Sequence, residues 1–327
     1  MRSMLKRASL GFFLLMIAVA SASASERPVV RVGVLKFGTV SWELDVMRRH
    51  GFDRARGIDV EPLELAGKDS AAVALQGGAV DVILTDWLWV ARRRGLGGDF
   101  TFAPHSHAAG GLIVRVDAGI KDIGDLKGRK IGVAGGPIDK SWLILRAYAQ
   151  KTAALDLVRD AQPVFAAPPL LTETMRRGDL SAVLNFWQYN ARLPVVGYVE
   201  LVRIEDMLSA LDLAPETPLL GWVFSERWAA ANADALRSFL DAAATARMVL
   251  ARSSEEWRAI APLTQVADAE TLERLHLAYA RGISGEAPGD LGGAAQRLLD
   301  LLMGIGGIDE APPDGRVPPG TFFSGAP

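Results

Sequence analysis

Two tryptophans one hundred positions apart, Trp87 and Trp187, are well suited to hold a small ligand. Each follows a short apolar run inside a repeated stretch, LQGGAVDVILTDWLWVAR at 75–92 and MRRGDLSAVLNFWQYNAR at 175–192. A short run rich in β-branched residues is typical of a parallel strand buried on both faces. Ligands bind beyond the carboxyl ends of the strands in open parallel sheets. The repeat therefore predicts two similar lobes that each present an aromatic side chain to a shared cleft.

Further residues have side chains or backbone suited to binding. The aromatic residues able to sandwich a flat or cationic group are Trp42, Trp87, Trp187 and Tyr189. Glycines that let backbone and a helix N-terminus approach a ligand are Gly38, Gly67, Gly135 and Gly136. Hydroxyls that can cap a helix, donate to a ligand or do both are Thr39, Ser41, Ser70 and Ser141. Cations able to bind an anionic group are Lys36, Lys68, Lys140 and Arg192, although a solvated lysine is the usual outcome.

Metal binding and catalysis find little support in the motifs. His105 and His107 lie close together, but the chain has four His, no Cys and no acidic partner at ligand spacing, so we predict no metal site. Contact between His105 and the ligand is the preferred alternative. The sequence has no G-x-S-x-G elbow, no H-E-x-x-H helix and no P-loop. We predict no catalytic residues and no cofactor.

Composition narrows the class of protein. A chain of 327 residues is long enough for two α/β lobes. The absence of Cys excludes a lipoprotein anchor, thiolate metal sites and Cys nucleophiles. A formal net charge of −2 without a basic run gives no electrostatic footprint for nucleic acid, so no nucleic-acid partner is expected.

The first residues have the pattern of an export signal. Basic residues precede the apolar run 10–20, and small residues follow at 21–24. This pattern predicts a cleavable signal peptide over 1–24 and a periplasmic location. An uncleaved anchor is the alternative, but the run is short for a bilayer span.

The positions of these residues follow from an alternation of strands and helices, which predicts an α/β fold. Strands or extended segments are expected at 28–36, 57–63, 80–84, 112–116, 130–134, 163–167, 183–186, 197–204 and 215–224. Helices are expected at 42–50, 70–76, 122–127, 140–151, 171–177, 226–251, 254–261, 268–281 and 294–303. Residues 101–111 are expected to form a loop, and the tail 304–327 to be irregular. Lobe 1 would comprise 25–112 plus 219–327 and lobe 2 would comprise 113–218, with hinge crossings near 112–115 and 219–222.

Several stretches resemble the nitrate/sulfonate/taurine-type substrate-binding proteins of ABC importers, and thiamine-precursor binders share the pattern. These stretches are GVLKFGTVSWELDVMRRHGFDRARGIDVEPLEL, QGGAVDVILTDW, IKDIGDLKGRKIGVAGGPIDKSWLILRAYAQ and MRRGDLSAVLNFWQYNAR. The resemblance covers about residues 30–280, and DLKGRKIGV is its most specific motif. It implies a type II periplasmic binding protein fold, with two α/β lobes, a hinge and a ligand cleft between them. The enzyme branch that builds the thiamine pyrimidine needs a Cys-rich motif, which this chain lacks.

The resemblance also implies that loops at the carboxyl ends of strands hold the ligand. The predicted ligand-binding residues are Phe37, Gly38, Thr39, Trp42, Ser70, Asp86, Trp87 and His105 from lobe 1, with Gly135, Gly136, Asp139, Ser141, Trp187 and Tyr189 from lobe 2. Asp86 is the best candidate for specificity because many relatives have a small or neutral residue there. Its carboxylate would favour a ligand with N–H donors or positive charge over nitrate or a bare sulfonate. The alternative is a salt bridge to Arg92–Arg94 one turn on.

These features together predict the periplasmic substrate-binding component of an ABC importer. We expect a monomer, not an enzyme, that binds a small organic or anionic solute of the sulfonate, nitrate or pyrimidine-like class and docks on an inner-membrane permease with its ATPase. A first alternative is a periplasmic enzyme on the same fold, pyrimidine-forming or lyase-like, with a reactive side chain such as Lys36, Lys140 or His105. A second is a ligand-sensing adaptor read by another membrane protein.

Overall fold

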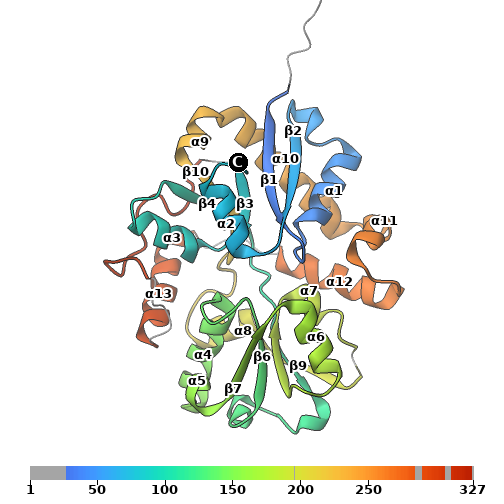
Figure 1. Cartoon of the computed structure of the whole chain (residues 1–327), viewed down its shortest axis with the longest axis vertical. Coiled ribbons are helices and arrows are strands. Elements are labelled where there is room, and N and C mark those ends of the chain that lie inside the picture. The colour runs from blue at the N-terminus through green and yellow to red at the C-terminus, as the bar shows by residue number, and fades with distance from the viewer. Residues whose placement is uncertain (1–26, 195, 284–288, 306–310, 326–327) are drawn as a thin grey trace, which may run out of the picture.

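Two mixed five-stranded sheets form the framework of the molecule (Figure 1). The computed structural model describes residues 27–194, 196–283, 289–305 and 311–325, so the predicted signal peptide lies outside the described residues. The strand order is β2-β1-β3-β10-β4 in one sheet and β7-β6-β8-β5-β9 in the other. The two orders are equivalent when β6, β7, β8, β5 and β9 replace β1, β2, β3, β10 and β4. The predicted two-lobe α/β architecture is confirmed.

The first sheet and the helices packed on it are called lobe 1. Its strands are β1 (Val29–Leu35), β2 (Asp59–Leu65), β3 (Val82–Thr85), β4 (Phe100–Ser106) and β10 (Leu220–Ser225). Its helices are α1 (Val40–His50), α2 (Lys68–Gln76), α3 (Trp87–Gly95), α9 (Glu226–Ala231), α10 (Ala233–Arg252), α11 (Ser254–Thr264) and α12 (Ala269–Gly282). Strand β1 runs parallel to β2 and β3, whereas β10 runs antiparallel to β3 and β4.

The second sheet and its helices are called lobe 2. Its strands are β5 (Gly111–Arg115), β6 (Lys130–Ala134), β7 (Gln162–Ala166), β8 (Ala182–Asn185) and β9 (Tyr198–Arg203). Its helices are α4 (Lys140–Ala153), α5 (Leu157–Asp160), α6 (Pro168–Arg176), α7 (Trp187–Asn190) and α8 (Ile204–Ala210). Strand β6 is parallel to β7 and β8, and β5 is antiparallel to β8 and β9. Helix α13 (Leu291–Gly304) packs against α4.

The chain crosses between the sheets twice. Strand β4 ends at Ser106 in lobe 1 and β5 begins at Gly111 in lobe 2. The return runs from the end of α8 at Ala210 to the start of β10 at Leu220. The first crossing lies just before the predicted segment 112–115, which is within β5, and the second includes residue 219, where the predicted segment 219–222 begins. Hinge motion at these crossings stays a prediction.

The central strand β3 is buried as its apolar run predicts, with Val82 0% and Ile83 1% exposed. Its surroundings differ from the expectation, because it has one parallel neighbour, β1, and one antiparallel neighbour, β10. The expected loop at 101–111 is wrong for its first half, where β4 forms the edge of the sheet. Pro104 obscures this strand in the sequence, but an edge position tolerates a residue without an N–H donor.

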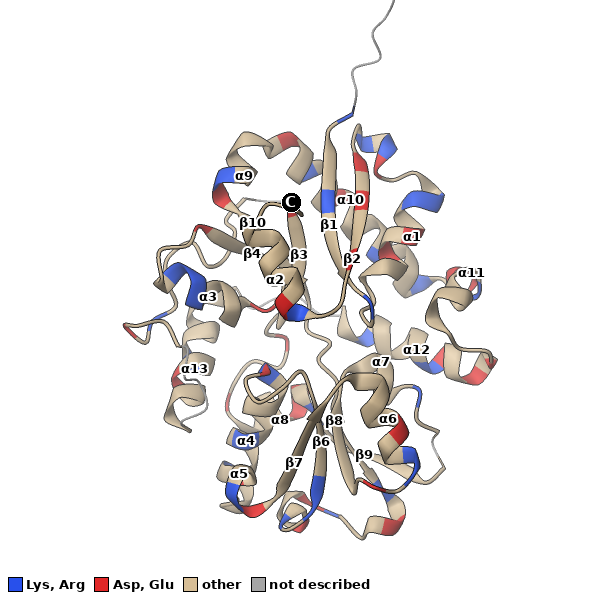
Figure 2. Cartoon of the chain, viewed as in Figure 1, with Lys and Arg blue, Asp and Glu red and all other residues tan. Residues whose placement is uncertain are grey.

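Two further helical predictions need adjustment. The long helix expected at 226–251 is two helices, α9 and α10, that meet at Asn232. The helix expected at 122–127 is a 3-10 turn, Ile123–Leu126. Charged residues of both signs are interspersed over both lobes (Figure 2). In the described part of the chain, no helix is both long and apolar enough to cross a membrane.

Candidate functional site between the lobes

Four charged side chains meet where the first turns of α2, α3 and α4 converge. Lys68 begins α2 and Asp86 caps α3 in lobe 1, while Asp139 caps α4 and Lys140 begins it in lobe 2. These helices follow β2, β3 and β6, so the charges lie beyond the carboxyl ends of strands, where ligands bind in open α/β sheets. The four residues are called the interlobe cluster.

An ion pair joins the lobes inside this cluster. Lys68 Nζ lies 2.5 Å from Asp139 Oδ2 and 4.0 Å from Asp86 Oδ2. The Asp139 side chain is fully buried, and its Oδ1 accepts from the Ser141 N–H at 2.9 Å. Burial alone would raise the pKa of Asp139, but the charges of Lys68 and Lys140 and the two hydrogen bonds lower it to about 2. The carboxylate is therefore ionised at every physiological pH.

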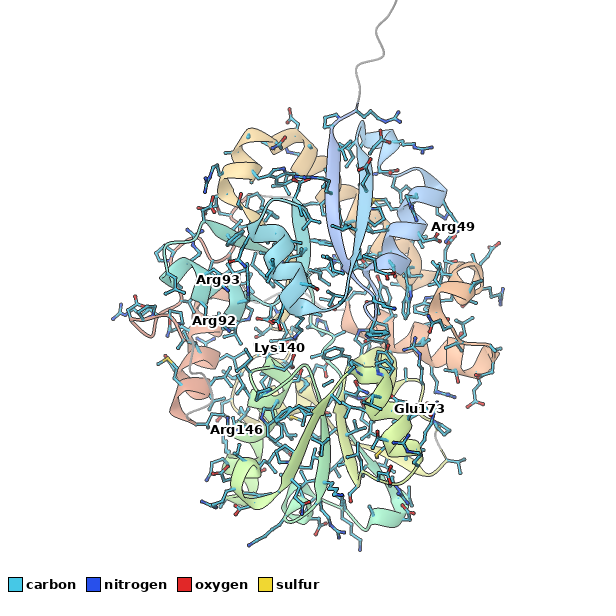
Figure 3. The ribbon with its side chains drawn as sticks, in the orientation of Figure 1. Arg49, Arg92, Arg93, Lys140, Arg146 and Glu173 are labelled. Carbon is cyan, nitrogen blue, oxygen red and sulfur yellow. The ribbon has the colours of Figure 1, made fainter. Side chains whose placement is uncertain are left out.

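Lys140 and Ser141 are the unsatisfied members of this region. Lys140 is 4% exposed and lies between the lobes (Figure 3). Its ammonium has charged neighbours in Lys68, Asp139 and Asp86 but makes no hydrogen bond to the described residues. Burial and the charge of Lys68 lower the pKa of Lys140, and Asp139 opposes them. Ser141 Oγ is buried without a hydrogen-bond partner in the described chain.

The glycine pair before α4 makes room for Asp139. Gly135 and Gly136 have φ angles of 87° and 92°, in the left-handed region that favours glycine. A Cβ at Gly135 would lie 2.2 Å from Asp139 Oδ2. The structure therefore needs glycine at 135 so that this carboxylate can lie over the loop and reach Lys68.

Trp187 joins the lobes through aromatic contacts. Its ring, at the start of α7, lies edge-on to Trp42 with a centroid separation of 6.1 Å and 5.9 Å from Tyr279. Gln188 beside it donates to the carbonyl of Phe37 at 3.2 Å. Trp187 thus lies between lobes, as the repeat predicts, although its ligand contact stays a prediction.

Trp87 occupies the equivalent position at the start of α3 but has different surroundings. Its side chain is 1% exposed, and its ring packs 6.1 Å from Phe322. The segment 311–325 returns to lobe 1, where Phe102 N–H bonds to the Thr321 carbonyl at 2.9 Å. This segment covers α3, and Trp87 is buried in a hydrophobic cluster that includes residues of both lobes, so its ligand contact stays a prediction.

His105 is held by a buried carboxylate and not by an open loop. Its Nε2 lies 3.1 Å from Glu43 Oε1, which also accepts from the Tyr279 hydroxyl at 2.7 Å. Burial and the Glu43 charge raise the pKa of Tyr279 well above its usual value. His107 instead faces the carbonyl of Arg281. The described residues contain no group of three or more His, Asp or Glu arranged to hold a metal.

The remaining predicted residues near lobe 1 have local roles. Phe37, 40% exposed, lies with Gly38 in the loop between β1 and α1, which Thr39 ends as the N-cap of α1 without a side-chain cap bond. Trp42 is 3% exposed between Trp187 and Trp257. Ser70 Oγ exchanges hydrogen bonds with the backbone of Gly67 and so caps α2.

Asp86 and Tyr189 also have protein partners. Asp86 Oδ1 accepts from Trp89 N–H at 3.0 Å, so the residue is a helix cap as well as a neighbour of Lys68. The Tyr189 ring lies 4.8 Å from the Arg192 guanidinium, and burial raises the pKa of its hydroxyl. Arg192 also donates to a lobe 1 carbonyl, that of Thr264, at 2.9 Å.

Lys68 and Lys140 are the central residues that the predicted ligand-binding set omits. The sequence analysis names both as cations able to bind an anion, but a lysine is usually exposed to solvent. The signal for them is positional, because each begins a helix directly after a strand and a glycine-containing loop. Lys68 also lies 5.7 Å from the Phe186 ring of lobe 2.

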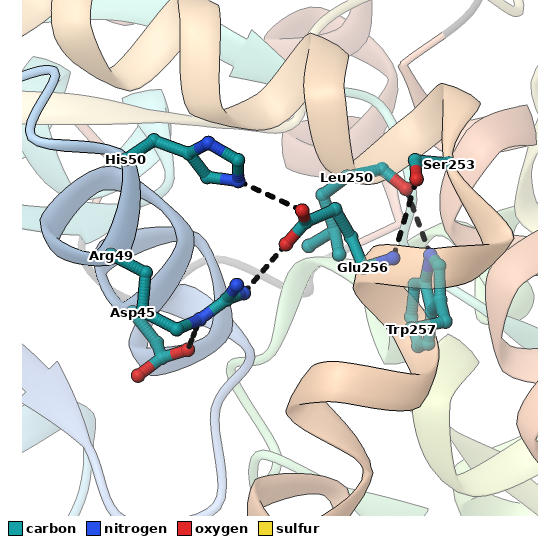
Figure 4. A network of polar contacts seen from close by, with 7 residues as sticks. All are labelled: Asp45, Arg49, His50, Leu250, Ser253, Glu256 and Trp257. Carbon is teal, nitrogen blue, oxygen red and sulfur yellow. Dashed lines mark hydrogen bonds and ion pairs between the residues drawn. The ribbon is translucent and has the colours of Figure 1, made fainter.

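A second ionic network joins α1, which contains Trp42, to α11 (Figure 4). Glu256 on α11 lies 2.6 Å from the Arg49 guanidinium and 2.8 Å from His50 Nε2, both on α1. Burial would raise the pKa of Glu256, but these two bonds outweigh it and lower the pKa. The next residue, Trp257, packs on Trp42.

Sequence and structure comparisons agree with this architecture. A sequence model of the NMT1/THI5-like family matches residues 44–253, more than half of the chain, so this protein belongs to that family. A search of curated proteins found no match. Among solved structures, the alkanesulfonate-binding protein SsuA from Xanthomonas axonopodis pv. citri, bound to MOPS, is similar with a TM-score of 0.69 and 17% identity over 88% of this chain and 97% of that one.

Two other solved structures show the range of proteins with this fold. The periplasmic aliphatic sulphonate binding protein SsuA from Escherichia coli has a TM-score of 0.68 and 17% identity over 89% of this chain and 97% of that one. The desulfurization enzyme DSZB has a TM-score of 0.58 and 15% identity over 90% of this chain and 98% of that one. The predicted type II periplasmic binding protein fold and the resemblance to nitrate/sulfonate/taurine-type binding proteins are confirmed.

Proposed function

We propose that this protein is the periplasmic substrate-binding component of an ABC importer and that it binds a small organic anion between its lobes. The observation that carries the proposal is Lys140, a residue only 4% exposed whose ammonium makes no hydrogen bond to the described residues. Beside it lie the unpartnered Ser141 hydroxyl and Lys68 from the other lobe. A buried ammonium without an acceptor is costly, and an oxyanion supplies the missing acceptors.

The proposed mechanism is lobe closure around that anion. Lys68 is in lobe 1 and Lys140 is in lobe 2, so an open form would separate them. An anion that contacts both lysines has a higher affinity for the closed form and therefore favours closure. A micromolar dissociation constant corresponds to about −8 kcal/mol. A few hydrogen bonds to charged groups, each contributing about 1.5–3 kcal/mol, supply binding energy of this order. The packing of Trp187 on Trp42 further stabilises the closed form.

The family and the predicted export signal support the physiological setting. The structural neighbours include proteins described as binding alkanesulfonates and aliphatic sulphonates. A sulfonate, nitrate or pyrimidine-like solute is therefore the class to test first. The partners we propose are an inner-membrane permease and its ATPase, with the binding protein itself a monomer.

Isothermal titration calorimetry on the mature chain tests the proposal. The panel comprises alkanesulfonates, nitrate, small carboxylates and pyrimidines, applied to the wild type, Lys140→Met and the control Lys130→Met, which removes an exposed lysine of the same lobe. We expect micromolar binding of at least one anion, weakened at least about tenfold by Lys140→Met. The control should bind like the wild type. If no anion binds, or if Lys140→Met binds equally well, the proposal is wrong.

An enzyme on the same fold is the second candidate. The observation in its favour is again Lys140, because burial lowers its pKa and a neutral amine is a nucleophile. The likeness to a desulfurization enzyme concerns the fold alone. Product formation from a panel solute by the purified protein, abolished by Lys140→Met, would favour the enzyme, whereas binding without turnover favours the transporter component.

A further inference from the structure

We propose that the interlobe cluster limits the ligand to one negative charge, so that a monoanionic oxyanion binds and a dianion of the same size is excluded. This inference rests on the proposed anion-binding function, and it concerns which anions the same site accepts. Asp86 is the residue that we assign to setting the limit.

The first step is the charge balance of the cluster. The two lysines of the cluster balance its two aspartates, and at its edge Arg92 interacts electrostatically with Asp86 and Asp69 with Lys68, so the region has no excess positive charge. The Lys68 ammonium is already bonded to Asp139 at 2.5 Å. Lys140 makes no hydrogen bond to a carboxylate of the cluster and is therefore the cation able to bond an incoming ligand, with the buried Ser141 hydroxyl as a neutral donor.

The second step is that neither carboxylate is free to leave. Asp86 accepts from Trp89 N–H at 3.0 Å and caps α3. Asp139 accepts from Ser141 N–H at 2.9 Å and caps α4, while its other oxygen contacts Lys68. Rotation of either side chain out of the site would expose unpaired N–H groups at a helix start.

The consequence follows from electrostatics in a buried site. One negative charge on the ligand pairs with Lys140. A second negative charge has no cation left in the cluster and lies near Asp86 and Asp139, where screening by water is weak and like charges repel strongly. Asp86 contributes to this repulsion while being less buried than Asp139, with 15% of its side chain exposed.

Asp86→Asn isolates this effect. Asparagine retains the oxygen that accepts from Trp89 N–H and caps helices as well as aspartate does. It removes one negative charge from the cluster and leaves Lys68 bonded to Asp139. The matched control is Asp69→Asn, because Asp69 also lies in the first turn of α2 near Lys68 but is exposed to solvent.

The experiment is calorimetric titration of the wild type, Asp86→Asn and Asp69→Asn with methanesulfonate and with sulfate at neutral pH. The two ions share a tetrahedral shape and differ by one charge. We expect the wild type to prefer methanesulfonate by at least about a hundredfold, and Asp86→Asn to reduce that preference at least about tenfold by gaining sulfate affinity. Asp69→Asn should keep the wild-type preference.

The outcomes separate this inference from the function on which it rests. Equal wild-type affinity for both ions, or an unchanged preference in Asp86→Asn, overturns the charge limit while anion binding stands. If none of the three proteins binds either ion, and the wild type also binds no other anion, the proposed function fails and the charge limit fails with it.

Discussion

The equivalent tryptophans of the repeat should respond to truncation in opposite ways. Trp187→Ala removes the two aromatic contacts between the lobes, with Trp42 at 6.1 Å and Tyr279 at 5.9 Å. Such pairs contribute about 0.5–1.5 kcal/mol each, so the closed form should lose about 1–3 kcal/mol. A difference of this size corresponds to a roughly 5–150-fold loss of ligand affinity. The melting temperature should fall less than in Trp87→Ala, because Trp187 is only partly buried where it packs against the core around Trp42.

Trp87→Ala should instead affect stability. Trp87 is 1% exposed against Phe322, and truncation of a buried tryptophan costs about 3–5 kcal/mol. The melting temperature should fall by at least about 6 °C. Differential scanning calorimetry and titration with the tightest-binding anion of the panel measure both quantities. Unchanged affinity in Trp187→Ala, or unchanged melting in Trp87→Ala, would refute the reasoning.

Three further predictions follow from the charged groups. Lys68→Met should weaken anion binding about tenfold or more, because Asp139 loses its partner and then competes with the ligand for Lys140. Calorimetric titration measures the anion affinity of this variant, and an unchanged affinity would contradict the prediction. As pH rises, anion affinity should begin to fall at a pH below the usual pKa of lysine. The reason is that burial lowers the pKa of Lys140, and the neutral amine no longer attracts an anion. Calorimetric titrations at a series of pH values test this, and constant affinity up to pH 10.5 would count against it. Glu256→Gln should lower the melting temperature by roughly 2–4 °C through loss of about 1 kcal/mol. Since bonds from Arg49 and His50 lower the pKa of Glu256, this stability is present above the unfolded pKa and disappears as pH falls through the folded one. Melting curves for both proteins from pH 7 to pH 3 should therefore converge, and curves that stay parallel would disprove the assignment.

The repeat predicts topology well and side-chain surroundings poorly. Strands β3 and β8 occupy the same place in equivalent sheets, and Trp87 and Trp187 each begin the following helix. Their neighbours differ because Phe322 packs on Trp87 from a segment more than 230 positions further along the chain. A local pattern contains no information about such a contact.

The burial of the lysines is likewise a tertiary effect. Lys140 follows Asp139 in the sequence, and the pattern around it is that of an ordinary exposed helix start. Its burial arises because lobe 1 brings Lys68 and Asp86 against it. The sequence identifies the glycine loop before α4, but the room that Gly135 leaves for the Asp139 carboxylate depends on the folded loop.

The strand β4 shows a different limit of sequence patterns. Pro104 and the nearby histidines indicate a loop, yet Thr101 and Phe102 are buried in an edge strand paired with β10. That partner is more than one hundred positions away, and only the pairing explains why a proline-containing segment is extended.

A crystal structure of the protein with the tightest-binding anion of the panel tests the central claim most directly. We predict that the oxyanion lies between the lobes, with its oxygens about 2.7–2.9 Å from Lys140 Nζ and within hydrogen-bond distance of Ser141 Oγ. Lys68 should face it from lobe 1. An anion bound outside the interlobe cluster, or one that leaves Lys140 without a hydrogen bond, would contradict this account.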